Sequence, residues 1–299
     1  MADAPVDVGV ELGGTKIVVA SSPGDAQIDR RLRIPTGSPV PTLEAVRDAI
    51  VEVAAHHPIR GIGIASFGPL DLRSGSPRFG TLIRTPKPEW SGVDVVRGIA
   101  PDDAVPVRID TDVAGALMAE HAWGAAQGRA SAYITVGTGI GAAIMVDGVI
   151  VTGANHSEIG HVRVPRHPDD PYPGRCPYHG DCLEGMACGP AVEERFGRPP
   201  HELSGGSRED AVELVAWYLA HGITSMASVV PVDVVVIGGG VAKFPGLHDT
   251  VSDACATASG GYPPVPFAEG GPEIVAPGLG DDAGVLGAIL LARAAAGEG

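Results

Sequence analysis

Short apolar runs alternate along this chain with longer stretches that carry apolar side chains at helical spacing. The runs are rich in valine and isoleucine, which predicts buried strands at residues 6–10, 16–20, 62–65, 105–109, 132–136, 142–146 and 232–237. Apolar positions three and four apart predict helices at residues 43–56, 112–123, 208–227 and 282–296. Strands that alternate with helices indicate an α/β protein.

One strand–turn–strand unit occurs twice in this pattern. In the first copy the turn is centred on Gly13-Gly14-Thr15, and in the second it is Gly137-Thr138-Gly139-Ile140-Gly141. This internal repeat predicts two structurally related halves that face each other. We therefore expect the functional site in the cleft between the two halves.

The two turns are candidates for binding a polyphosphate. Glycine lets backbone N–H groups approach phosphate oxygens closely, and the hydroxyls of Thr15 and Thr138 add donors. Either turn alone is also typical of an ordinary hairpin, and the sequence contains no Walker loop. Their pairing favours a nucleotide, and the later glycines are expected to wall its adenosine: Gly238, Gly239, Gly240, Gly278 and Gly280.

Length and charge narrow the class of protein. A chain of 299 residues favours two domains. With 36 acidic against 21 basic residues, a net charge of -15 and no basic cluster, nucleic-acid binding is not expected. No apolar stretch reaches the roughly 18 residues of a membrane span, and the first residues do not resemble a leader. We expect a cytoplasmic protein without a membrane partner.

A cysteine–histidine cluster lies in the long irregular segment at residues 151–186. Cys176, His179 and Cys182 follow one another at three-residue intervals, and His161 lies upstream in Glu158-Ile-Gly-His161. Two thiols and two imidazoles are the complement that a tetrahedral zinc site requires. A disulfide between the two cysteines is the alternative, which a reducing compartment disfavours. The other two cysteines, Cys188 and Cys255, are expected to be buried apolar residues.

Several acidic residues have positions that suit phosphoryl transfer to a sugar. Asp112 begins a predicted helix, where it is either a helix cap or the base that accepts a hydroxyl proton. Glu158, His161 and Glu184 bracket the cysteine cluster and suit the hydroxyl-rich face of a sugar. Two further carboxylates, Glu11 and Asp110, are either surface acids or hold Mg²⁺ through water.

Together these segments resemble the bacterial sugar kinases of the ROK family, from about residue 7 to 290. The resemblance rests on Val8 to Lys16, Ser66-Phe-Gly-Pro69, Thr85 to Trp90, Thr111-Asp112, Gly137 to Gly141, Glu158-Ile-Gly-His161, Cys176 to Glu184 and Gly238-Gly-Gly240. The cluster Cys-Pro-Tyr-His-Gly-Asp-Cys-Leu-Glu-Gly-Met is similar to that of the zinc-containing fructokinase branch, whereas the glucokinase branch usually has Cys-x-Cys-Gly-x-x-Gly-Cys.

The resemblance implies a two-domain, actin-like ATPase fold with ribonuclease-H-like domains at residues 1–112 and 113–299. It places a zinc loop at 156–186 and implies that the C-terminal helix, 282–297, packs back on the first domain. The family usually forms dimers, so we expect a homodimer. The expected reaction is ATP-dependent phosphorylation of a hexose, most directly D-fructose at its 6-hydroxyl, with Mg²⁺ and Zn²⁺ bound.

The resemblance also assigns residues. It implies Asp112 as the general base, zinc ligands at His161, Cys176, His179 and Cys182, with His167 as rival to His161, and Glu11 near Mg²⁺. His161 would bind zinc with one ring nitrogen and the sugar with the other. Substrate contacts are expected at Gly68, Pro69, Thr85, Thr111, Glu158, His161 and Glu184, and ATP contacts at Gly13, Gly14, Thr15, Lys16, Gly137, Thr138, Gly139, Gly238, Gly239 and Gly240.

Three positions depart from the family pattern: Glu11 where many members have Asp, Thr111 where an Asn often contacts sugar, and Ala114 where Asn is frequent. The last two bear on substrate choice rather than on the reaction class. Kinases for glucose, mannose or an N-acylated hexosamine therefore stay open. A sugar-sensing regulator is disfavoured because the first turn begins too near Met1 to leave room for a DNA-binding domain, and a non-catalytic sugar-binding or scaffold protein is a further alternative.

Overall fold

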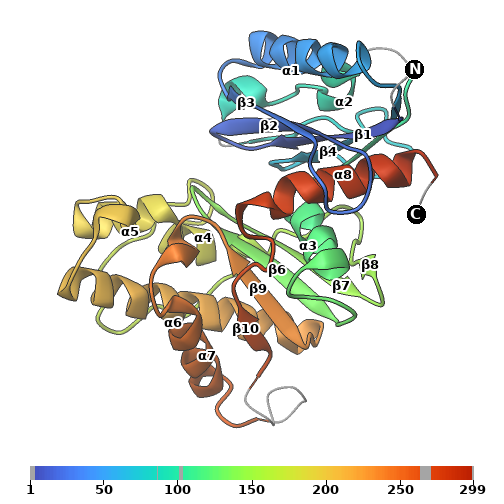
Figure 1. Ribbon diagram of the computed structural model, residues 1–299. Coiled ribbons are helices and arrows are strands. Elements are labelled where there is room, and N and C mark those ends of the chain that lie inside the picture. Colours follow the sequence, from blue (N-terminus) through green and yellow to red (C-terminus); the bar gives the residue numbers. More distant parts are fainter. Residues whose placement is uncertain (1–3, 86, 101–103, 263–270, 298–299) are drawn as a thin grey trace. The chain divides into compact units, whose positions relative to one another are not determined.

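The computed structural model describes residues 4–85, 87–100, 104–262 and 271–297 (Figure 1). The chain forms two compact units. Unit 1 runs to Trp123 and also contains Thr152–His156 and the chain from Asp281 onward. Unit 2 contains Gly124–Val151 and Ser157–Gly280. The division expected at residue 112 would separate a strand from the helix that follows it, whereas unit 1 contains both.

Unit 1 is built on a five-stranded mixed sheet with the order β3-β2-β1-β4-β5. β1 pairs antiparallel with β2 and parallel with β4, and β5 continues the parallel side. The strands are β1 (Val6–Leu12), β2 (Lys16–Ser22), β3 (Arg30–Pro35), β4 (Ile59–Ser66) and β5 (Val107–Thr111), and the helices are α1 (Pro39–Ala54), α2 (Val95–Ile99), α3 (Asp112–Trp123) and α8 (Ala283–Ala295). One face of the sheet carries α1 and α2, and α8 packs on β1 and β4 from the other face (Figure 1).

Unit 2 has a second five-stranded sheet, with the order β10-β9-β6-β7-β8. Its strands are β6 (Ser131–Val136), β7 (Ile140–Val146), β8 (Val149–Ile150), β9 (Val234–Gly238) and β10 (Glu273–Val275). Its helices are α4 (Leu183–Ala187), α5 (Gly189–Phe196), α6 (Gly206–Val229) and α7 (Leu247–Ala258). The apolar core of this unit lies where α4, α5, α6 and α7 meet the sheet.

The two sheets have the same topology. In each, the first strand pairs antiparallel with the second and parallel with the fourth, and the fifth strand extends the parallel side. The turn between β1 and β2 therefore corresponds to the turn between β6 and β7. This confirms the α/β class and the repeated strand–turn–strand unit that the sequence predicts.

The edge strand β3 was not expected, and its sequence explains why. Arg-Arg-Leu-Arg-Ile-Pro has no continuous apolar run, and most of its side chains are exposed. Charged residues and a proline are common at sheet edges because they prevent pairing with another chain. The apolar pattern also does not indicate the short strands β8 and β10 or the helices α2, α4, α5 and α7, and it places the start of the first helix at residue 43, whereas α1 begins at Pro39.

Glycine lets a strand and a helix of unit 1 pack at the level of their backbones. A Cβ atom built on Gly63 of β4 would lie 1.9 Å from the carbonyl oxygen of Ala288 in α8. Likewise, a Cβ atom on Gly287 would lie 2.0 Å from the carbonyl oxygen of Gly115 in α3. Glycine at these positions is therefore required by close packing, and it holds α3 and α8 against the parallel strands.

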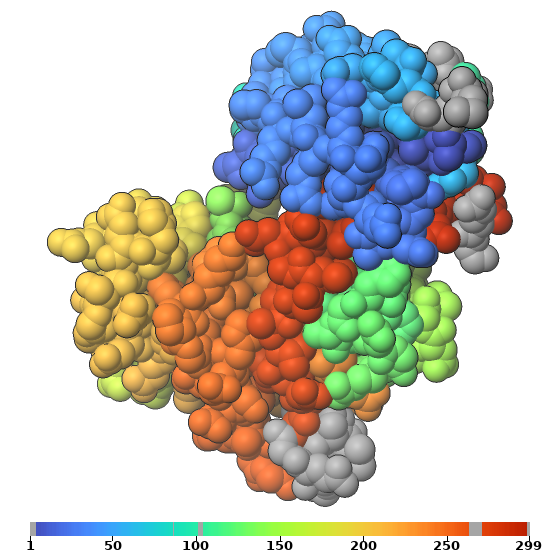
Figure 2. Space-filling model, in the orientation of Figure 1, coloured from blue at the N-terminus to red at the C-terminus, as the bar shows by residue number. Residues whose placement is uncertain are grey.

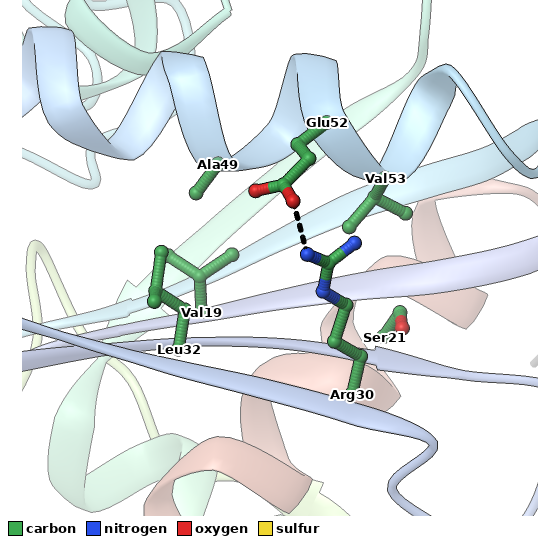
Figure 3. A pocket seen from close by; sticks show the side chains of 7 residues that line it. All are labelled: Val19, Ser21, Arg30, Leu32, Ala49, Glu52 and Val53. Atoms are coloured by element: carbon green, nitrogen blue, oxygen red, sulfur yellow. Dashed lines mark hydrogen bonds and ion pairs between the residues drawn. The ribbon is translucent and has the colours of Figure 1, made fainter.

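The exposed side of α1 forms part of the surface of unit 1 in Figure 2 (blue). Beneath α1 is a small hollow of about 10 Å³, room for roughly one water molecule. It lies against β2 and β3, and an ion pair between Arg30 and Glu52 spans it (Figure 3). Among the described residues, no helix is both long and apolar enough to cross a membrane.

We expect Gly63→Ala to lower the free energy of unfolding by about 2–4 kcal/mol, because the new methyl group overlaps the backbone of α8. Gly206→Ala at the start of α6 is the matched control, since a Cβ atom there meets nothing within 4 Å. Urea denaturation of both variants checks this. Equal stability of the two variants would contradict the packing described for Gly63.

Candidate functional site

The strand register of unit 1 brings its candidate residues to one edge of the sheet. Leu12, the last residue of β1, pairs with Ser66 at the end of β4, and Ser66 pairs with Thr111 at the end of β5. The segments that follow these residues are the glycine turn at 13–15, the loop that contains Gly68 and Pro69, and Asp112. In open α/β sheets, ligands bind at this carboxyl edge.

Hydrogen bonds to the backbone of Gly13 hold the turn between β1 and β2 in place. The amide of Gly13 donates to the carbonyl of Lys16 at 3.1 Å, and the hydroxyl of Thr36 donates to the carbonyl of Gly13 at 2.8 Å. The side chains of Thr15 and Lys16 are exposed. Lys87, which the sequence analysis did not single out, lies close by, since its Cε is 3.9 Å from a Cβ atom built on Gly14.

Thr111 caps helix α3, which leaves the carboxylate of Asp112 available for another role. The hydroxyl oxygen of Thr111 accepts a hydrogen bond from the amide of Ala114, three residues on, at 3.2 Å. This is the usual geometry of a helix cap. Asp112 accepts from the next amide in the chain, that of Val113, at 2.9 Å. The structure thus assigns the cap to Thr111 rather than to Asp112.

Burial at this edge raises the pKa values of three carboxyl groups. Burial raises the pKa of Asp112 to about 6 and the pKa of Asp110 in the same direction. The pKa of Glu11 rises to about 7, mainly through burial, with a contribution from the negative charge of Asp112. Glu11 and Asp112 are thus near enough to sense each other, and a cation beside them would favour their ionised forms.

His156 is a residue of this edge that the sequence analysis missed. Its Nε2 accepts a hydrogen bond from the amide of Leu70 at 3.0 Å, just after the Gly68–Pro69 loop. Asn155 binds the same segment, because its side chain accepts from the amide of Leu72 and donates to the carbonyl of Leu70. His156 lies near enough to Asp112 to influence the pKa of that carboxyl electrostatically. Its position shortly before Glu158 is the only sequence signal that could have indicated it.

Thr85 and its neighbours form a buried support for this edge. Thr85 is buried, and its hydroxyl oxygen accepts from the amide of Lys87 at 3.4 Å. Trp90 is fully buried and donates to the carbonyl of Gly37 at 3.0 Å. The ring of Phe67, next to Gly68, packs edge-on against Trp90 with centroids 5.6 Å apart. The indole thereby holds the loop after β4 in place.

In unit 2, the turn at Gly137–Gly139 lies beside the second glycine segment. Gly238, at the end of β9, pairs with Thr135 of β6, just before the turn. A Cβ atom on Gly238 would lie 2.2 Å from the hydroxyl of Tyr133, and Gly239 has φ of +92°, which favours glycine. In unit 2, the turn expected to contact phosphate and the glycines expected to contact adenosine therefore lie at the ends of neighbouring strands of one sheet.

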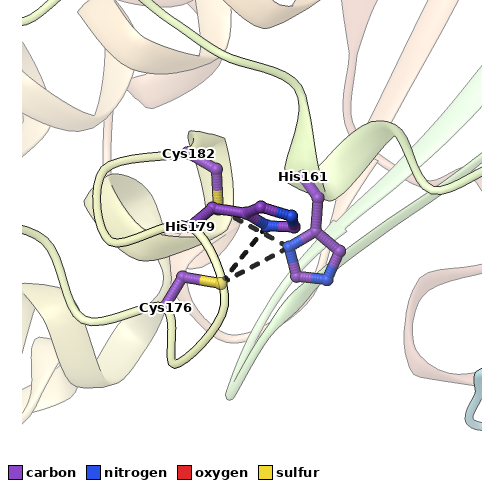
Figure 4. A group of neighbouring side chains, drawn as sticks. All are labelled: His161, Cys176, His179 and Cys182. Carbon is purple, nitrogen blue, oxygen red and sulfur yellow. Dashed lines mark hydrogen bonds between the residues drawn. The ribbon is translucent and has the colours of Figure 1, made fainter. Parts of the chain in front are cut away.

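His161, Cys176, His179 and Cys182 converge on one point in unit 2 (Figure 4). One ligand atom from each lies within 4.8 Å of those of the other three. Nδ1 of His161 is 3.5 Å from Sγ of Cys182 and 3.7 Å from Sγ of Cys176, which is also 3.7 Å from Nδ1 of His179. Neighbouring ligands in a tetrahedral zinc site are about 3.6 Å apart, from bonds of about 2.0 Å to nitrogen and about 2.3 Å to sulfur. The four side chains fit such an ion.

The alternatives left open for this cluster are not formed. Cys176 and Cys182 are free thiols rather than a disulfide. His167 lies outside the cluster: its ring packs edge-on against Trp217, with centroids 4.9 Å apart, and its Nδ1 accepts from the amide of Asp169. The cluster loop is closed by two hydrogen bonds between the backbones of Cys176 and Gly180.

The two glutamates beside the cluster differ in their surroundings. Glu158 is exposed and immediately precedes the short 3₁₀ helix Ile159–His161. Glu184 is half-buried in α4, and its Oε2 accepts from the amide of Ile140 at 3.0 Å. One of the expected sugar contacts is therefore attached to the turn between β6 and β7, a link that the sequence did not reveal.

A sequence model of the ROK family matches residues 7–295. The chain belongs to the ROK family. A fructokinase of Zymomonas mobilis is 41% identical over 292 residues, 96% of each chain, and a putative fructokinase of Bacillus subtilis is 36% identical over 96% of this chain and 95% of its own.

Solved structures of ROK proteins have the same fold. A ROK hexokinase from Thermus thermophilus is 30% identical and superposes with a TM-score of 0.77 over 98% of this chain and 100% of its own. A ROK family glucokinase from Streptomyces griseus, in complex with glucose and AMPPNP, is 23% identical, with a TM-score of 0.78 over 97% of this chain and 99% of its own. The two mixed sheets are thus those of the actin-like ATPase fold that the resemblance to the ROK family implied.

The raised pKa of Asp112 predicts that ionisation of this carboxyl lowers the stability of the fold as pH rises. The unfolded chain ionises this carboxyl near its ordinary pKa of 3.8, whereas the folded protein holds it protonated up to about pH 6. The charged carboxylate therefore destabilises the fold increasingly as pH rises from 4 to 6, and fully above that. We expect Asp112→Asn to raise stability by on the order of 1–3 kcal/mol at pH 8 and by little at pH 4.

Thermal unfolding of Asp112→Asn across this pH range measures the effect. Asp48→Asn, on the exposed side of α1, is the control and should show no such pH dependence. A gain of stability for Asp112→Asn that is equal at both pH values would contradict the burial of the charge.

Proposed function

We propose that this ROK sugar kinase transfers the γ-phosphoryl group of ATP to the 6-hydroxyl of D-fructose. The observation that carries the proposal is similarity along the whole chain to fructokinases, from 41% identity for the Zymomonas mobilis enzyme to 32% for that of Streptococcus mutans. The cysteine–histidine cluster, with His179 between the two cysteines, supports the same branch of the family.

Asp112 is proposed to act as the general base. It accepts the proton of the sugar hydroxyl as that oxygen forms a bond to the γ-phosphorus, while the bond from phosphorus to the β,γ-bridging oxygen breaks and ADP leaves. Its pKa of about 6 leaves the carboxylate ionised at neutral pH and a stronger base than an exposed aspartate. Its attachment to the rigid start of α3 favours a fixed position for attack.

The phosphates are assigned to the turns Gly13–Lys16 and Gly137–Gly139, and the adenosine to Gly238–Gly240. Mg²⁺, when bound, neutralises charge that develops on the phosphoryl oxygens. We assign Glu11 to Mg²⁺, through water, because it is a half-buried carboxylate whose raised pKa a cation would lower.

The proposed sugar contacts are Gly68, Pro69, Thr85, Thr111, Glu158, His161 and Glu184. The hydroxyl oxygen of Thr111 accepts the capping bond, and the same side chain hydrogen-bonds to the carboxylate of Asp110. A hydroxyl oxygen has two lone pairs, so it can also accept from a sugar hydroxyl. Nδ1 of His161 lies near the sulfurs of Cys176 and Cys182 and would hold the metal there, which would leave Nε2 for a sugar hydroxyl. Metal binding thus orients the ring that contacts the substrate.

Zinc is the ion we propose for the cluster of His161, Cys176, His179 and Cys182. The distances between these donors match a tetrahedral site, and paired thiols and imidazoles select zinc over Mg²⁺.

We also propose that the protein is a homodimer, and sedimentation equilibrium would test this. A second candidate substrate class, aldohexoses, is favoured by the 26% identity to a glucokinase of Thermotoga maritima over 96% of this chain.

The substrate proposal is tested by ADP release with fructose, glucose, mannose and N-acetylmannosamine, measured side by side. We expect kcat/KM to be highest for fructose, and Asp112→Asn to reduce kcat about 10²-fold to 10⁴-fold. The Asp48→Asn control should leave both unchanged. A clear preference for an aldose would contradict the assignment of fructose as the substrate. Undiminished turnover of Asp112→Asn would contradict the role of Asp112 as general base.

The zinc proposal is tested by the metal content of purified variants. We expect about one zinc ion per wild-type chain, and its loss in His161→Ala and His179→Ala, because a tetrahedral site does not retain the ion well with a ligand removed. His167→Ala is the matched control and should retain the metal, since its ring lies against Trp217. Loss of zinc from His167→Ala alone would overturn the ligand set.

A further inference from the structure

Two segments that carry metal ligands contact the backbone of Ile140. Glu184 accepts the hydrogen bond of the Ile140 amide at 3.0 Å, and Glu184 lies two residues after Cys182. Gly160 lies so close that a Cβ atom on it would be 1.8 Å from the Ile140 carbonyl oxygen, and His161 follows directly.

Ile140 is the first residue of β7, and it immediately follows the turn at Gly137–Gly139. That turn is held at two more points. The amide of Gly189, at the start of α5, donates to the carbonyl of Gly137 at 2.7 Å. Gly139 is so near Glu184 that a Cβ atom on it would lie 2.6 Å from Oε2. The conformation of the turn is therefore tied to α4, α5 and the segment before His161.

The two segments that contact Ile140 are joined to each other. The amide of Leu183, between Cys182 and Glu184, donates to the carbonyl of Val162 at 3.0 Å. An ion held by His161 and Cys182 would bind the same two segments more firmly, and would fix the positions of Gly160 and Glu184 around Ile140. Without an ion, these segments are linked by hydrogen bonds, by packing and by an ion pair between Arg163 and Asp181.

We propose that Glu184 is a positioning residue through which the metal cluster orders the turn between β6 and β7, so that the metal supports nucleotide binding as well as sugar binding. This inference rests on the proposed function, because it assigns the turn to ATP. A carboxylate that accepts a backbone amide makes a charge-assisted hydrogen bond, stronger than one between neutral groups. Glu184 contributes most when Cys182 is held by metal.

A sugar contact and a positioning role for Glu184 predict different results in the absence of sugar. We would measure the affinity of Mg²⁺-AMPPNP by calorimetry for wild type, Glu184→Ala and Glu184→Gln, with no sugar present. The positioning role predicts about tenfold or greater weakening for Glu184→Ala. Glu184→Gln should stay within about threefold of wild type, because the amide oxygen of Gln can still accept from Ile140. Glu193→Ala, an exposed carboxylate on α5, should not change the affinity.

Removal of the metal provides the second part of this experiment. After treatment with a chelator, dialysis and return of Mg²⁺, wild type should lose nucleotide affinity by a factor similar to that of Glu184→Ala. The two changes should be far from additive when combined, because both act through the same hydrogen bond. Circular dichroism on every sample establishes whether the fold is retained. If Glu184→Ala does not fold, nucleotide affinity is compared instead between the metal-loaded and stripped forms of wild type and of Glu184→Gln.

The outcomes separate the two proposals. Unchanged nucleotide affinity in folded Glu184→Ala, or in the stripped wild type, would overturn the positioning role while it leaves the kinase proposal standing. A metal-loaded wild type that binds no Mg²⁺-AMPPNP but folds normally would overturn the proposed function, and this inference with it.

Discussion

The parallel register of β1, β4 and β5 is the constraint on which the site in unit 1 depends. Leu12, Ser66 and Thr111 pair across the three strands, so the segments that follow them must emerge at one edge. No single strand could place a glycine turn, a substrate loop and a carboxylate so close together. The same topology in unit 2 brings Gly238 beside the turn after β6. Burial at this edge destabilises the charged form of Asp112, and the raised pKa of this carboxyl is the result.

The long segment between β8 and α4 has little regular secondary structure, and a buried polar network stabilises it. Asp170 and Arg195 form an ion pair at 2.8 Å whose side chains are 2% and 6% exposed. The hydroxyl of Tyr218 in α6 donates to the same carboxylate at 2.6 Å, and Arg195 lies over the ring of Tyr172. Loss of one partner of such a pair is costly, because the other charge stays buried. The network holds the segment that carries the cysteine–histidine cluster.

Sequence patterns predicted the features that depend on residues close together in the sequence. Apolar runs located the central strands, and the spacing of Cys176, His179 and Cys182 identified the donors that converge with His161. Contacts between segments distant in sequence could not be predicted in this way. The pairing of Glu184 with Ile140 and of His156 with Leu70 joins residues 44 and 86 positions apart. The edge strand β3 was missed because its side chains face solvent, where no apolar pattern is required.

Asp112 is proposed as the base that acts on the 6-hydroxyl of fructose, and a crystal structure with fructose, Mg²⁺ and AMPPNP tests this most directly. The predicted result is a fructose O6 within about 3 Å of the Asp112 carboxylate and in line with the γ-phosphorus. A fructose bound with O6 away from Asp112, or with another hydroxyl presented to the γ-phosphorus, would contradict the account.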